Sequence, residues 1–125
     1  MSFDIFVQKF DAGGAGTADA AVVRAILAPY FNGNDTRVLH LSDGTADLYG
    51  WEKLSRGFMI NHAGGAEIYD VLVRVAREAR LAILPVGCGT VVTSPDEIAH
   101  LPSELREDVA VVTNGRELLA VIRRR

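Results

Sequence analysis

Apolar and polar residues alternate in several short segments of the chain and recur at helical spacing in others. Alternating or continuous apolar runs predict strands at 3–10, 36–41, 46–51, 57–62, 81–86, 90–93 and 108–113. Apolar residues three and four positions apart predict helices at about 18–29, 66–79, 95–100 and 115–123. A hairpin in the first half, followed by alternating strands and helices, favours an α/β fold, with α+β as the alternative. We expect a single mixed sheet of about five to seven strands with the helices packed on it.

The dipeptide Asp43-Gly44 predicts a tight turn between the segments 36–41 and 46–51. A two-residue loop at this dipeptide would pair Ser42 with Thr45 and therefore His40 with Asp47. One face of the predicted hairpin is then apolar and should point to the core. The other face carries Val38, His40, Asp47, Tyr49 and Trp51.

The length and composition describe one globular domain covering residues 1–125. The chain has 49% hydrophobic and 23% charged residues and contains no repeat or linker-like segment. Its 13 basic and 16 acidic side chains give a net charge of -3. Because nucleic-acid binding needs concentrated positive charge, this balance argues against a nucleic-acid partner.

Cysteine content and hydropathy bear on the compartment. The single cysteine, Cys88, cannot form an intramolecular disulfide, which fits a reducing environment. Asp4 interrupts the N-terminal apolar stretch where a signal peptide would need an unbroken one. The longest uncharged segment, 81–95, is interrupted by proline and glycine and is too short to cross a bilayer. We therefore expect a soluble cytoplasmic protein with no membrane partner.

A candidate site follows from the order strand 57–62, helix 66–79, strand 81–86. A crossover of this kind makes the two strands parallel, so that their carboxyl ends share the sheet edge where α/β proteins bind ligands. If strand 108–113 is also parallel, a third strand end joins the same edge. The residues expected there are Asn61, His62, Gly64, Gly65, Cys88, Thr113 and Asn114.

Two kinds of chemistry are conceivable at that edge. Cys88, held between two glycines, could be an exposed nucleophile whose thiolate is stabilised by His62. The alternative is a buried apolar thiol and a strand-end histidine satisfied by backbone groups. The turn Gly64-Gly65 could offer backbone N–H groups to an anion, or it could simply allow a tight turn into the helix.

Metal and cofactor signatures are not found in the sequence. Histidines 40, 62 and 100 lack the spacing of a metal site, and no second cysteine could complete a thiolate set. No glycine-rich nucleotide-binding pattern surrounds Gly64-Gly65. We expect neither a metal nor a cofactor.

The outward face of the hairpin is the candidate partner surface, with His40, Asp47, Tyr49 and Trp51 as its binding residues. Tyrosine and tryptophan are favoured anchors at interfaces. The alternative is that helix 18–29 or another segment of the same chain covers this face, which would make it part of the core.

The main functional hypothesis is therefore a protein-binding or self-associating module, including a homodimer. A neutralising immunity or antitoxin-type protein is one such role. The competing hypothesis is a small enzyme or ligand-binding protein that uses His62 and Cys88.

Overall fold

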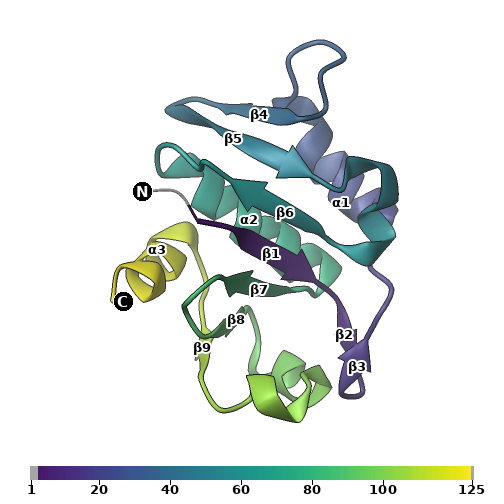
Figure 1. The fold of residues 1–125 in the computed structure, drawn as a ribbon, viewed down its shortest axis with the longest axis vertical. Coiled ribbons are helices and arrows are strands. Elements are labelled where there is room, and N and C mark those ends of the chain that lie inside the picture. The colour runs from purple at the N-terminus through teal and green to yellow at the C-terminus, as the bar shows by residue number, and fades with distance from the viewer. Residues whose placement is uncertain (1–2, 125) are drawn as a thin grey trace.

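The computed structural model describes residues 3–124 and has a seven-stranded mixed sheet in the order β4-β5-β6-β1-β7-β8-β9 (Figure 1). The strands are β1 (Ile5–Gln8), β4 (Val38–Leu41), β5 (Gly44–Tyr49), β6 (Phe58–Asn61), β7 (Ala82–Pro85), β8 (Thr90–Val92) and β9 (Val109–Val111). The α-helices are α1 (Ala20–Leu27), α2 (Glu67–Ala79) and α3 (Gly115–Arg123). The predicted α/β class, with helices packed on a mixed sheet, is confirmed.

The helices form a second layer on one face of the sheet. In Figure 1 the sheet faces the viewer, and α1 and α2 lie behind it. Alternate strand residues such as Ile5, Leu39 and Ile60 are fully buried and belong to the same core cluster as Leu72 of α2. Because side chains alternate between the two faces of a strand, the residues between these buried ones point away from the helices.

β1 occupies the middle of the sheet and separates the two strands that α2 connects. It pairs antiparallel with both β6 and β7, so β6 and β7 are parallel, as predicted. They are not neighbours, however, and lie about 10 Å apart, or two strand spacings. β8 is antiparallel to β7, and β9 is parallel to β8. β9 therefore runs opposite to β6 and β7. Thr113 and Asn114 were expected beside the carboxyl ends of β6 and β7 only if strand 108–113 were parallel to them, and this condition is not met.

The glycine-rich segment after β1 is ordered, which the sequence analysis did not predict. It forms a two-stranded sheet from β2 (Phe10–Asp11) and β3 (Gly14–Ala15), with Ala12 and Gly13 at positive φ in the turn. The Gly13 N–H donates to the carbonyl of His100 at 3.0 Å. The hairpin is thus attached to the segment that follows β8.

The segment after β8 covers one corner of the sheet on the side away from the α-helices. It contains two 3₁₀ helices, η3 (Pro95–His100) and η4 (Ser103–Leu105). The helix predicted at 95–100 has these bounds but the tighter 3₁₀ form. Leu101 from this segment packs with Ala82 and Val92 in a small second core. The rest of that face, over β4, β5, β6 and β1, carries no helix (Figure 1).

The hairpin has a different loop from the predicted one. Leu41 pairs with Gly44 and Val38 with Asp47, so the loop residues are Ser42 and Asp43. Because Val38 now opposes Asp47 and not Tyr49, the register moves by two residues, and the side chains of residues 38–41 and 46–49 keep their predicted faces. His40 therefore opposes Thr45, and the expected His40–Asp47 pair is not formed.

The reason for this loop lies in α2. The Asp43 carboxylate accepts the Ala66 N–H at 2.8 Å, and the Glu67 carboxylate accepts the Ser42 N–H at 2.6 Å. This reciprocal arrangement resembles a capping box, but it joins two segments that are distant in sequence. Gly44 is required for close approach and not for a positive φ, since a Cβ on it would lie 2.4 Å from the Gly64 carbonyl oxygen.

Strand β5 also ends two residues earlier than predicted. Gly50, at φ 104°, turns the chain into the 3₁₀ helix η2 (Trp51–Arg56). A further 3₁₀ turn, η1 (Ala28–Tyr30), extends α1. Trp51 is thereby removed from the strand and packs edge-on against Phe31, with ring centroids 4.7 Å apart.

No helix within residues 3–124 has the length and apolarity needed to cross a membrane.

Burial of Tyr69 on α2 gives a testable pH dependence. Desolvation raises the pKa of its hydroxyl above the usual 10.0, opposed in part by the charge of Arg123. Because the pKa is higher in the folded protein than in the unfolded chain, the associated stability is fully present below pH 10.0. It is lost as the pH rises through the pKa of the folded state. We expect urea midpoints to fall above pH 10.0, and to fall less in Tyr69→Phe. Equal slopes in the two proteins would contradict this origin.

Candidate functional site

The face of the sheet that the α-helices leave uncovered, which we call the open face, carries a continuous apolar row across four strands. Tyr49 is the register partner of Met59, Met59 of Phe6, and Phe6 of Leu84. Directly opposed residues lie on the same face, so these four side chains adjoin one another. Tyr49 is 52% exposed, and the other three are half-buried. We call this set, Tyr49, Met59, Phe6 and Leu84, the apolar row.

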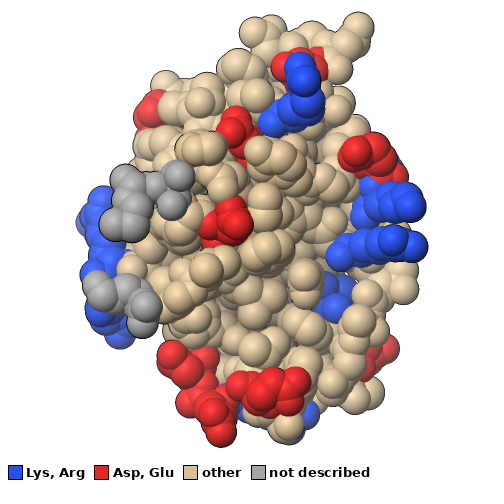
Figure 2. Space-filling view, viewed as in Figure 1, with Lys and Arg blue, Asp and Glu red and all other residues tan. Residues whose placement is uncertain are grey.

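A polar row runs beside the apolar row, two residues away along each strand. Asp47 opposes Asn61, whose side-chain amide donates to the carboxylate of Asp4, the residue just before β1. The Asp47 carboxylate also lies 2.8 Å from the Nδ1 atom of His62, within hydrogen-bond distance. The histidine that meets Asp47 is thus His62 and not His40. Figure 2, in the same view, shows a mainly uncharged face with a few acidic side chains in its middle.

His62 and Cys88 are not brought together as the catalytic hypothesis requires. The ring of His62 is directed to Asp47 on β5, whereas Cys88 follows β7 on the other side of β1. Cys88 lines a separate cavity of about 290 Å³ with Asp108 and Val121. Cys88 therefore adjoins residues of β9 and α3, whereas the imidazole of His62 contacts β5.

The two glycines after β6 serve the contact with the hairpin. The Gly64 N–H donates to the Thr45 carbonyl at 2.8 Å, and Gly65 has a φ of 82°. The first N–H groups of α2 are occupied by Asp43, so the position proposed for an external anion already holds the chain's own carboxylate. Negative charge at a helix N-terminus is favourable, which is consistent with this use.

Thr113 and Asn114 have a role in starting α3, away from the carboxyl ends of β6 and β7. The Asn114 side chain accepts the Glu117 N–H at 2.9 Å, and the Glu117 carboxylate accepts the Thr113 N–H at 2.7 Å. This is a variant of the capping box in which the glutamate accepts the N–H of the residue before the N-cap.

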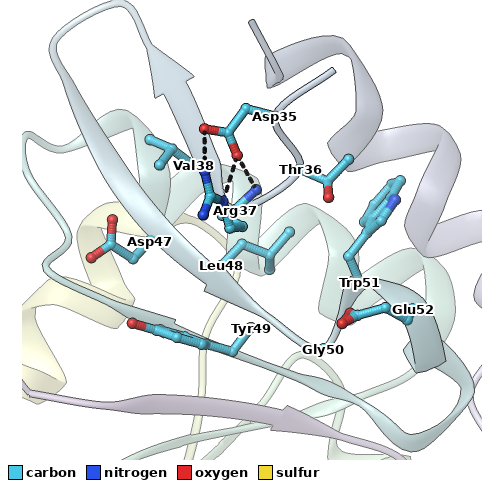
Figure 3. A pocket seen from close by; sticks show the side chains of 10 residues that line it. All are labelled: Asp35, Thr36, Arg37, Val38, Asp47, Leu48, Tyr49, Gly50, Trp51 and Glu52. Carbon is cyan, nitrogen blue, oxygen red and sulfur yellow. Dashed lines mark hydrogen bonds and ion pairs between the residues drawn. The ribbon is translucent and has the colours of Figure 1, made fainter. Parts of the chain in front are cut away.

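A cavity of about 460 Å³ lies at one end of the open face, where β5 extends past β4 (Figure 3). Three of the four residues proposed to bind a partner line it: Asp47, Tyr49 and Trp51. His40 is exposed but does not line it. The remaining lining residues are Asp35, Thr36, Arg37, Val38, Leu48, Gly50 and Glu52.

An ion pair borders this cavity. The Arg37 Nε and backbone N–H both donate to the Asp35 carboxylate, at 3.1 and 3.0 Å. These hydrogen bonds hold the pKa of the Asp35 carboxyl below its usual value of 3.8 and raise that of Arg37. Both side chains are largely solvated, so the pair fixes local geometry more than it stabilises the fold.

Asp4, Phe6, Met59 and Leu84 were not predicted as parts of this face. For the three apolar residues a signal was present, because the segments 3–10, 57–62 and 81–86 carry apolar residues on both faces, and alternation alone assigns only one face to the core. Residues 3–124 contain no group of three His, Cys, Asp or Glu side chains placed to hold a metal ion.

Comparison of the chain with protein-family models, with curated proteins and with solved structures found no match.

Proposed function

We propose that this protein acts by binding another protein through the open face of its sheet. The observation that carries the proposal is the apolar row, which lies on the side away from all three α-helices. Contiguous apolar surface with a polar margin is typical of protein interaction sites. Tyr49, at one end of the row, is 52% exposed, and Val86, two residues after Leu84 at the other end, is 55% exposed.

A neutralising role of the immunity or antitoxin type belongs to this proposal, because such a protein needs a binding face and no catalytic group. A second copy of the chain is the other partner that the proposal includes. The alternative of an enzyme built on His62 and Cys88 gains no support from the geometry, since β1 separates the two strand ends.

Site-specific photocrosslinking tests the proposal. The photoreactive amino acid p-benzoylphenylalanine replaces Tyr49 or Val86, one at a time, in the cells that naturally express the protein. The matched control position is Ala25, which is exposed on α1 in the helical layer. We expect the same adduct from positions 49 and 86 and none from position 25. An adduct of twice the 13.5 kDa chain mass would identify a second copy as the partner.

Adducts of equal yield from all three positions, or none from positions 49 and 86, would refute binding through the open face. If the adduct contains an enzyme, inhibition of that enzyme by the purified protein would support the neutralising role.

A further inference from the structure

Glu97, on the 3₁₀ helix η3, carries a buried carboxylate for which the chain supplies no partner. The residue is 8% exposed. Among residues 3–124, its side chain takes part in no ion pair and in no hydrogen bond. Burial of an unpaired carboxylate is costly, because the charge loses water without gaining another partner. A cationic group from outside the chain would remove this cost.

The Glu97 side chain borders a cavity of about 170 Å³ between the last turn of α2 and the start of η3. It also borders a void of about 10 Å³, which is hardly large enough for one water molecule. Within the described part of the chain, the one fully sealed polar side-chain atom without a hydrogen bond is Asn61 Oδ1. The Glu97 oxygens therefore keep some accessible surface, and the larger cavity is the space with room for a ligand beside them.

Four charged side chains surround this cavity, two of each sign. The six lining residues are all polar: Arg77, Arg80, Thr93, Ser94, Asp96 and Glu97. No ion pair joins any of the four charged ones in the segment that the structure describes, so opposite charges share the cavity without contacting each other. A cation alone would be repelled by the two guanidinium groups, and an anion alone by the two carboxylates. A ligand that carries both charges avoids both repulsions.

The two arginines are fixed by contacts at the end of α2. Arg80 ends the helix at φ 57°, a left-handed conformation in which glycine is the usual residue. The Lys9 ammonium group donates to the Arg80 carbonyl at 3.2 Å, and the Arg77 guanidinium donates to the Thr113 carbonyl at 3.4 Å. A guanidinium group binds a carboxylate through two parallel hydrogen bonds, so these side chains suit the anionic end of a ligand.

We propose that this cavity binds a small free α-amino acid, with its carboxylate on Arg77 and Arg80 and its ammonium group on Glu97. The volume of about 170 Å³ is below the roughly 300–1,000 Å³ of pockets for drug-sized ligands, and the lining offers no apolar wall for a large side chain. The cavity shares no residue with the apolar row. The amino-acid site and the protein-binding face are therefore separate, and either can exist without the other.

Titration followed by NMR tests the site with glycine, L-alanine and L-serine as probes. We expect at least one of them to shift the backbone amide resonances of Ser94 and Glu97 saturably. The matched analogues of the best probe are its amide, which lacks the carboxylate, and its N-acetyl derivative, which lacks the ammonium group. Each should bind at least about tenfold more weakly, because each leaves charged groups of the cavity unpaired. No saturable shift with any probe, or an analogue that binds as well as the amino acid, would overturn the proposal.

Charge-removing variants assign each end of the ligand to its side chains. Glu97→Gln should abolish the preference for the amino acid over its N-acetyl derivative, since that preference measures the ammonium contact. Arg80→Gln should reduce the preference over the amide, which measures the carboxylate contact. Glu107→Gln is the matched control, because Glu107 is an exposed carboxylate outside the cavity. If Glu107→Gln changes either preference as much, general charge attraction explains the binding and the assigned site is wrong.

Urea unfolding gives a readout that a merely structural role of Glu97 would move in the opposite direction. Without ligand, Glu97→Gln should have a urea midpoint at least equal to that of the wild type, because the variant removes an unpaired buried charge. Added amino acid should raise the midpoint of the wild type and not that of the variant. A lower midpoint of the ligand-free variant would show that the Glu97 carboxylate already has a partner within the chain, and the amino-acid site would be refuted.

Discussion

Substitution of Gly65 by alanine is expected to lower the free energy of unfolding by about 2–5 kcal/mol. Gly65 has a φ of 82°, where a residue with a Cβ loses roughly 1–2 kcal/mol. The added Cβ would also lie 2.4 Å from the Asp43 carboxylate and 2.7 Å from the Asp43 carbonyl oxygen. Because that carboxylate holds the Ala66 N–H, it cannot move aside without uncapping α2, which costs about 1 kcal/mol more.

A matched variant separates the two causes. Gly13 has a φ of 87°, and a Cβ on it would meet no atom within 4 Å. Gly13→Ala should therefore show only the conformational part of the loss, about 1–2 kcal/mol. Urea unfolding of both variants followed by circular dichroism measures the difference. Equal losses would show that the hairpin loop does not pack on the start of α2 as described.

This contact also explains why the hairpin could not be predicted fully from its own sequence. Asp43-Gly44 satisfies the local rule for a tight turn, and the rule correctly identifies two strands and their faces. The loop is nevertheless set by Asp43 and Glu67, which are distant in the chain and exchange caps. Sequence spacing cannot reveal a cap that acts through space.

Elements with local signals were predicted well. The helix at 66–79 was expected from the spacing of its apolar residues, and α2 spans Glu67–Ala79. The helix at 115–123 was expected from the same kind of spacing, and α3 has these bounds. The Asn114 and Glu117 contacts that begin α3 lie within a few residues. The start of α2 is capped from a distance by Asp43, but the apolar stripe of this helix indicates its bounds without that contact. A local pattern is then sufficient.

The order and direction of strands depend on contacts that no local pattern encodes. β1 lies between β6 and β7, although the crossover through α2 alone would allow them to be neighbours. This insertion moves His62 away from Cys88 and leaves Asp47 as its partner. The outward side of the hairpin was predicted as a partner surface, and Tyr49 is exposed there. The apolar row that continues it across β6, β1 and β7 appears only once the strand order is known.

The packing of α3 on α2 is the second place where a single methyl group should have a large effect. A Cβ on Gly115 would lie 2.4 Å from the backbone nitrogen of Asp70 and 2.7 Å from the carbonyl carbon of Tyr69. These atoms belong to the central helix, which cannot yield without disturbing the core around it. Gly115 also donates its N–H to the Asp70 carboxylate at 2.8 Å, so it cannot shift without losing this bond.

Gly115→Ala is therefore expected to destabilise the protein by about 1–3 kcal/mol through overpacking. Helix propensity alone predicts the opposite sign, because alanine is favoured over glycine in a helix by up to about 1 kcal/mol. Urea unfolding distinguishes the two, and hydrogen exchange should show faster exchange confined to α3, where Leu118 is fully buried against the core. Gly14→Ala is the control, since the nearest atom to its Cβ would be 4.0 Å away. A Gly115→Ala variant as stable as wild type, or more so, would mean that α3 does not approach α2 closely enough to require glycine.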